Sequence, residues 1–202
     1  MSACIGPKRS PPLDLPRASP AAQGGEALLE AAANFHTETV EEILTIDGVD
    51  ANGRNSGGMT PLMLAAECGH TETVRVLLTA NAIDVNALDS DGFGSALTLA
   101  ARCGYAATVD ALLSADGIDV NLANEGRDTA LTAAVEGGIF WHVGFGFTAI
   151  VTSLLCAKGI DLTAHDQGSR ALSLCRKKEG FRVYDDGAIV TALEAACHWA
   201  AV

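Results

Sequence analysis

The stretch Met59–Leu78, with the sequence MTPLMLAAECGHTETVRVLL, decides the fold of the chain because it recurs along it. Four copies start 34, 35 and 34 residues apart, at Glu26, Thr60, Ser95 and Thr129. A fifth, more degenerate copy starts at Arg170, 41 residues after the fourth. Self-similarity at a period of about 20–50 residues indicates a stack of repeated supersecondary units.

Each copy has the pattern of two short helices. Pro61 occupies a first-turn position where its missing N–H costs nothing. Hydroxyl residues that can cap the first helix precede it in three copies, at Thr60, Ser95 and Thr129. We expect glycines to end this first helix, at Gly69, Gly104 and Gly138.

The second helix carries apolar residues at i, i+3 and i+4, which places them on one face. These stripes are Val40, Ile43 and Leu44; Val74, Leu77 and Leu78; Val109, Leu112 and Leu113; and Val151, Leu154 and Leu155. Residues suited to a left-handed conformation follow, at Gly48, Gly117 and Gly159, whereas Ala82 at the same place is expected to be slightly strained.

Helices this short are marginal alone, so the pairs must be stabilised by stacking on their neighbours. Extended segments such as Asp84–Asn86 and Asp119–Asn121, each followed by turn residues, are interpreted as hairpin loops between the pairs.

The pattern Thr60-Pro61-Leu62-x-Leu64-Ala65-Ala66-x-x-Gly69-His70, continued by Val74 and Leu77-Leu78, resembles the ankyrin repeat. The resemblance implies an all-α solenoid of about five helix-turn-helix repeats with short hairpin loops and a protein-binding concave face. We expect a disordered, proline-containing tail at 1–25 and a repeat domain at 26–202. The expected repeats are 26–58, 59–92, 93–127, 128–168 and 169–202.

Three features depart from the family pattern. The usual histidine after Thr-Pro-Leu is replaced in every copy, by Leu29, Met63, Thr98, Thr132 and Ser173, so its hydrogen bond to the cap hydroxyl cannot form. Insertions of eight and six residues interrupt the last two repeats. Glu194 replaces an apolar stripe residue, as expected where a terminal repeat meets water.

Composition restricts the partners. The formal charge of −12 would repel a phosphate backbone, so nucleic acid is not expected as a partner. No apolar run approaches the ~20 residues that span a bilayer, and the start of the chain lacks the apolar centre of a signal peptide. We expect a monomer in the cytoplasm or the nucleus, without membrane, cofactor or metal, whose six cysteines are reduced.

The resemblance implies that hairpin tips and the ends of first helices contact a partner protein. The candidate residues in the first loop region are Arg54, Asn55, Ser56, Met59 and Glu67; in the second Leu88, Ser90, Asp91, Phe93 and Arg102; and in the third Asn124, Glu125, Arg127, Asp128 and Glu136. Any one of them can equally be an ordinary solvated residue.

The insertion in the fourth copy adds aromatic candidates, at Phe140, Trp141, Phe145 and Phe147. They have two interpretations. Exposed, they would anchor a partner, and deleting 140–147 would weaken binding while the fold survives. Folded back, they would cover neighbouring helices, and the deletion would reduce helical content.

The chain is not expected to be an enzyme. The nearest catalytic candidates are Cys68 with His70 and Cys197 with His198, and the first pair is accounted for by the repeat pattern. The expected function is a protein–protein interaction module or adaptor, and the alternative is a regulatory subunit or inhibitor that occludes a partner enzyme.

Overall fold

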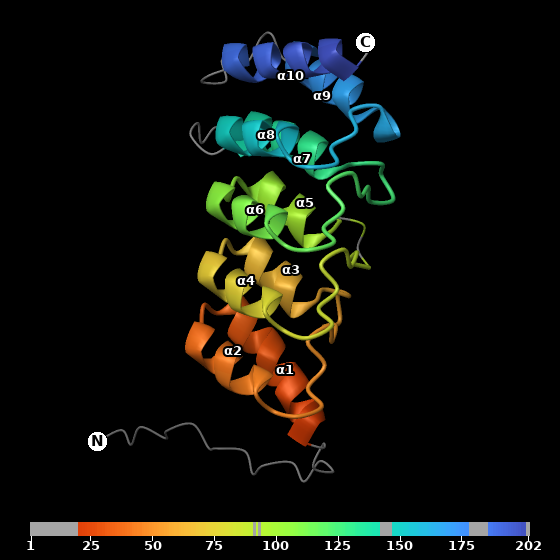
Figure 1. The fold of residues 1–202 in the computed structure, drawn as a ribbon. Coiled ribbons are helices and arrows are strands. Elements are labelled where there is room, and N and C mark those ends of the chain that lie inside the picture. The colour runs from red at the N-terminus through yellow and green to blue at the C-terminus, as the bar shows by residue number, and fades with distance from the viewer. Residues whose placement is uncertain (1–19, 91, 93, 142–146, 178–185, 201–202) are drawn as a thin grey trace, which may run out of the picture.

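The computed structural model of the 202-residue chain describes residues 20–90, 92, 94–141, 147–177 and 186–200. These residues form a regular stack of helices, with ten α-helices, a single 3₁₀ turn and no β-strand among them (Figure 1). The helices are α1 (Pro20–Ala33), α2 (Thr37–Leu44), α3 (Pro61–Glu67), α4 (Thr71–Leu78), α5 (Ala96–Cys103), α6 (Ala106–Leu113), α7 (Ala130–Trp141), α8 (Phe147–Leu155), α9 (Gln167–Lys177) and α10 (Asp186–Ala200), and the 3₁₀ turn η1 is Ala164–Asp166.

The helices are stacked in two rows. The odd-numbered helices contact one another in the order α1, α3, α5, α7 and α9, and the even-numbered helices do so from α2 to α10. Each odd helix also contacts the even helix that follows it, and long loops connect the successive pairs along one side of the stack (Figure 1). The all-α repeat fold expected from the sequence is therefore confirmed. Backbone hydrogen bonds close the loop tips, from Asn55 to Met59, Asp89 to Gly94 and Asn124 to Asp128. In the described part of the chain, no helix is long and apolar enough to cross a bilayer.

The core lies between the two rows. In each predicted stripe the first two residues are buried and the third is partly buried against the core; Val74 and Leu77, for example, are fully buried, and Leu78 packs beside them. The periodicity read from the sequence is thus confirmed by the burial of the side chains. At the C-terminal end Leu193 is buried, whereas Glu194 is exposed, as expected for a terminal unit.

The predicted helix caps are present. The hydroxyl of Thr60 accepts a hydrogen bond from the N–H of Met63 (3.3 Å), and equivalent bonds join Ser95 to Thr98 (3.4 Å) and Thr129 to Thr132 (3.5 Å). The residues in the place of the missing histidine complete these caps. The Met63 sulfur accepts from the Thr60 N–H (3.4 Å), and the Thr132 hydroxyl accepts from the Thr129 N–H (2.9 Å). Loss of the histidine therefore does not leave the cap without a partner.

Two element boundaries differ from the sequence prediction. Helix α1 begins at Pro20, so residues 20–25 are helical and do not belong to the expected tail. Gly138 does not end the first helix of its pair, because α7 continues to Trp141. The apolar residues after Gly138 allow another helical turn, which the glycine alone does not prevent.

A ladder of asparagine side chains connects successive loops. The Asn86 amide donates to the Gly117 carbonyl (2.8 Å), and its side-chain oxygen accepts from the Asp119 N–H (2.8 Å). Asn52 bonds Ala82 and Asp84 in the same way, and Asn121 bonds Gly159 and Asp161. Each rung satisfies backbone groups of the next repeat and so fixes the spacing between neighbouring loops.

The ladder predicts the effect of removing one rung. Asn86→Ala leaves the Gly117 carbonyl and the Asp119 N–H without these partners, and we expect the free energy of unfolding to fall by about 1–3 kcal/mol. Urea denaturation followed by circular dichroism measures it. The control is Asn81→Ala, at an exposed position outside the ladder, which should change stability by less than about 0.5 kcal/mol. Equal effects of the two substitutions would contradict the role of the ladder.

The residue four positions after the end of each of α2, α4, α6 and α8 adopts a left-handed backbone. Its φ is 82°, 78° and 87° at Gly48, Gly117 and Gly159, and 58° at Ala82, as expected from the sequence. A Cβ at this conformation costs about 1–2 kcal/mol, which the lower unfolded-state entropy of alanine offsets only in part.

We therefore expect Ala82→Gly to raise the free energy of unfolding by about 0.5–1 kcal/mol and Gly117→Ala to lower it by a similar amount. A Cβ at Gly117 meets no atom within 4 Å, so the second substitution tests backbone conformation alone. Thermal melts of both variants measure the two changes in stability. Melting temperatures that shift in the same direction would refute the explanation by backbone conformation.

Candidate functional site

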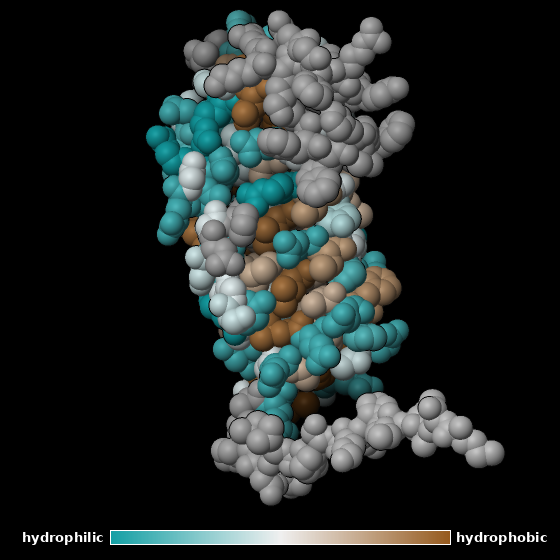
Figure 2. Space-filling model, turned by 180° about the vertical axis from the view of Figure 1, so that it is seen from behind, coloured by the Kyte–Doolittle hydropathy of each residue, from teal (hydrophilic) through white to brown (hydrophobic). Residues whose placement is uncertain are grey.

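The odd-numbered helices and the loops form one side of the stack. Seen from behind relative to Figure 1, this side carries a stripe of apolar side chains that runs along the stack, with hydrophilic residues on both flanks (Figure 2). Such a surface offers apolar contact area in its middle and polar specificity at its margins, which is the usual composition of an interface between proteins.

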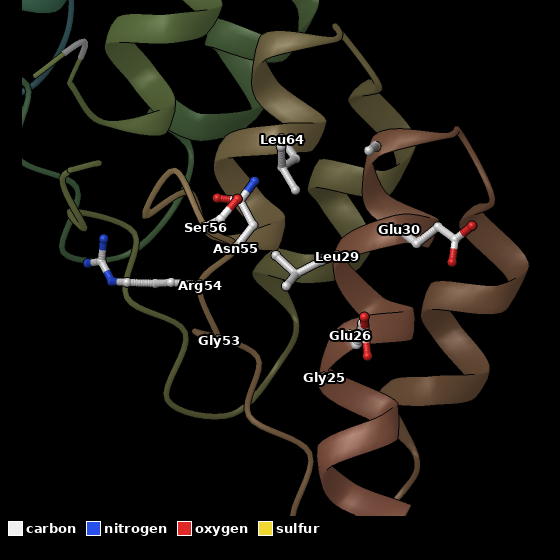
Figure 3. Close-up of a pocket in the computed structure, with 10 residues that line it drawn as sticks. Gly25, Glu26, Leu29, Glu30, Gly53, Arg54, Asn55, Ser56 and Leu64 are labelled. Carbon is white, nitrogen blue, oxygen red and sulfur yellow. The ribbon is translucent and has the colours of Figure 1, made fainter. Parts of the chain in front are cut away.

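A groove of about 730 Å³ lies at the N-terminal end of this side. Helix α1 contributes Glu26, Leu29 and Glu30, helix α3 contributes Leu64, and the loop 53–56 forms the opposite wall (Figure 3). Leu29 and Leu64 point toward one another across the groove (Figure 3). Of the predicted contact residues, the structure places Arg54, Asn55 and Ser56 in this wall.

Several candidate loop residues hold the loops in shape. The Arg54 guanidinium donates to the carbonyls of Gly58 and Leu88 (both 2.6 Å), so it joins two neighbouring loops. The Asn55 side-chain oxygen accepts from the N–H groups of Gly57 (3.0 Å) and Met59 (2.9 Å). Met59 itself is partly buried against the core. These residues shape the surface, and their polar groups are already used within the chain.

The third loop region is organised in the same way. The Asn124 side chain donates to the Gly92 carbonyl (2.7 Å) and accepts from the Asp128 N–H (2.8 Å). Asp128 pairs with Arg170 at 2.7 Å, and Arg127 pairs with Asp166 at 3.5 Å. Within this region, Glu125 is exposed at the loop tip.

The other candidates are divided by exposure. Ser56, Glu67, Leu88, Ser90 and Glu125 are exposed, and Leu88 retains 37% of its accessible surface. Arg102 and Glu136 are half-buried and take part in interactions within the chain. Asp91, Phe93 and Phe145 lie outside the described residues, as do the side chains of Phe140 and Trp141.

The family model for ankyrin repeats, in three copies, matches residues 28–124. Residues 28–124 therefore belong to the ankyrin repeat family. No curated protein matches the chain closely enough to be counted as a relative. Ankyrin repeats generally mediate protein–protein interactions and are typically non-catalytic.

Phe147, predicted from the sequence as a partner contact, is instead part of the core of this ankyrin stack. It begins α8 and is only 5% exposed. Its ring lies against Gly104 and Gly138, where an added Cβ would approach ring atoms to 2.9 and 3.1 Å. For this residue the folded-back interpretation of the insertion is right and the exposed-anchor interpretation is wrong. The physical reason is that two glycines leave room for one large ring.

Sequence reasoning missed two exposed aromatic residues at the short turns between paired ankyrin helices. Phe35 is 61% exposed with φ of 62°, and Tyr105 is 39% exposed. The Phe35 ring lies 5.0 Å from that of His70, and the Tyr105 ring covers Gly69. A signal was available, because Phe35 occupies the place of Gly69 in the aligned copies.

The structure gives no support to Cys68 and His70 as a nucleophile and base. His70 Nε2 lies 3.2 Å from the carbonyl oxygen of Ala33, and its ring faces Phe35. Burial, and then the charge of Glu67, raise the pKa of the Cys68 thiol, and burial raises the pKa of the Cys197 thiol. A raised pKa keeps each thiol in its protonated, unreactive form near neutral pH.

Phe147 and Phe35 make a matched pair for mutation. We expect Phe147→Ala to lower the free energy of unfolding by about 3 kcal/mol or more, because it empties a packed site beside α7. Phe35→Ala should cost less than about 1 kcal/mol, since it removes an exposed ring. Chemical denaturation of both variants checks this, and a comparable loss in both would contradict the assignment of Phe147 to the core.

Proposed function

We propose that the chain is an adaptor or interaction module that binds a partner protein through the concave side formed by its odd-numbered helices and its loops. The observation that carries the proposal is the apolar stripe on that side, bordered by hydrophilic residues (Figure 2). The loops also carry exposed side chains that have no part in the stacking core, among them Ser56, Leu88, Ser90 and Glu125. Truncating these residues should affect binding more than folding.

The proposal includes the rest of the chain. We infer that α7–α8 and α9–α10 are two further, degenerate repeats that continue the stack, because their helices contact the preceding pairs as the earlier helices do. The charge of −12 favours a basic partner surface over nucleic acid. We further propose that the chain is monomeric, non-catalytic and resident in the cytoplasm or the nucleus.

The alternative is a regulatory subunit or inhibitor that occludes a partner enzyme. It would use the same surface, so the two differ only in their consequence for the partner. Affinity capture from the protein's own cell extract, followed by an activity assay of a stoichiometric partner, separates them. Turnover that depends on added metal in the purified chain would instead support catalysis.

One substitution tests the surface directly. Leu88→Asp places a charge on an exposed loop residue beside the concave side, and we expect it to weaken binding of the captured partner at least tenfold, which corresponds to about 1.4 kcal/mol. Isothermal titration calorimetry with the purified partner measures the dissociation constant.

The matched control is Ile46→Asp. Ile46 is 43% exposed and follows α2, away from the loop tips, so the same change of charge and polarity should leave binding unchanged. If Ile46→Asp weakens binding as strongly as Leu88→Asp, or if neither does, the proposed surface is wrong.

A further inference from the structure

We infer that the groove between α1, α3 and the loop 53–56 binds an extended protein segment in which a large aliphatic side chain is flanked by lysine or arginine. The inference rests on the proposed function and specifies the partner's chemistry at one end of the surface. Three properties of the groove support it: an apolar floor, an acidic wall, and a cation on the opposite wall that is held away from the acidic side chains.

The floor consists of apolar side chains that the fold does not use. Leu29 and Leu64 are only half-buried, and neither belongs to the core or to the set of partly buried side chains that pack against it. They point toward one another across the groove, with Ala33 also lining it (Figure 3). An aliphatic side chain placed between them would remove the exposed surface of both from water.

The groove has a suitable size for a short segment. Its volume of about 730 Å³ falls within the range of roughly 300–1,000 Å³ that is usual for ligand sites. It lies between helix α1 on one side and the loop 53–56 on the other (Figure 3).

The wall formed by α1 is acidic. Glu26 and Glu30 are four residues apart, which places them as neighbours on one helix face together with Leu29 and Ala33. Both carboxylates are exposed, and the ion pairs of the described residues involve other acids. Two like charges one turn apart repel each other, so a cation from a partner between them would relieve that repulsion.

The opposite wall does not neutralise these carboxylates. The side chain of Arg54 extends away from Glu26 and Glu30 (Figure 3), and its guanidinium is held by the carbonyls of Gly58 and Leu88 at 2.6 Å. The groove therefore combines an apolar floor with carboxylates that no ion pair in the described part of the chain neutralises. A partner segment with an apolar residue next to a basic one complements both the floor and the carboxylates, whereas an acidic segment would be repelled by Glu26 and Glu30.

The test is selection of a phage-displayed random 12-residue peptide library on the full-length chain. We expect enriched peptides to carry an aliphatic residue within two positions of lysine or arginine. Fluorescence anisotropy with a selected peptide should show about tenfold weaker binding by Glu26→Gln/Glu30→Gln, and a loss of that difference at high salt. Leu29→Ala should weaken binding several-fold while leaving the melting temperature nearly unchanged, because Leu29 lies outside the core.

The control variant is Glu41→Gln/Glu42→Gln. It removes the same charge from exposed positions on α2, in the other row of helices, and should bind as the unchanged chain does. Equal weakening by the two double variants would assign the effect to net charge and overturn the inference.

The remaining outcomes separate this inference from the proposed function. Selected peptides that are not basic, or whose binding is insensitive to the groove variants, overturn the groove assignment, and the adaptor proposal then stands on the partner whose binding Leu88→Asp weakens. If no peptide is selected while that partner still binds, only the inference of a linear segment is overturned. Failure of both selection and partner binding overturns both proposals.

Discussion

The structure depends on one constraint, which is that no helix pair can bury its apolar face alone. The even-numbered helices from α2 to α8 are each eight or nine residues long, too short to be stable in isolation. Val74 and Leu77 are fully buried only because the flanking pairs cover them. Stability is therefore cooperative between neighbours along the stack, and the sides that do not face a neighbour are left available for recognition.

Stacking fixes which faces meet, and hydrogen bonds between repeats fix how they are aligned. The asparagine ladder joins one loop to the next through Asn52, Asn86 and Asn121. On the helices, hydrogen bonds between hydroxyl groups also connect neighbouring repeats. They join Thr37 to Thr73 and Thr71 to Thr108, both at 2.8 Å. At the C-terminal end a buried glutamine takes part, because Gln167 accepts from the Thr129 hydroxyl (2.8 Å) and donates to Asn121 (2.8 Å). The side formed by the odd-numbered helices and the loops inherits its shape from these bonds.

Most of the fold could be predicted from the sequence because local signals and the repeat period agree. The apolar spacing, the hydroxyl caps and the glycines after the helices each have a physical cause within a few residues, and the structure confirms them. Other features depend on side-chain contacts that the repeat pattern does not encode. The Phe147 ring packs against Gly138 inside α7, and the Met63 sulfur accepts the cap N–H of Thr60 in place of the usual histidine. Of the site, the loop residues could be located, but not the roles of Arg54 and Asn124 in joining neighbouring loops, because each has one partner more than thirty residues away.

The packing of Phe147 has a consequence for how this surface can evolve. Its ring fills space that exists only because residues 104, 137 and 138 lack side chains, and a Cβ at Gly137 would come within 2.7 Å of the ring. At Gly138 the ring is the nearest obstacle, so a larger residue there would be tolerated only together with a smaller one at 147. At Gly137 an added Cβ would also meet the backbone oxygen of Arg102, and at Gly104 the left-handed backbone itself disfavours a side chain. Related sequences should therefore keep glycine at 104 and 137 and vary 138 and 147 in concert.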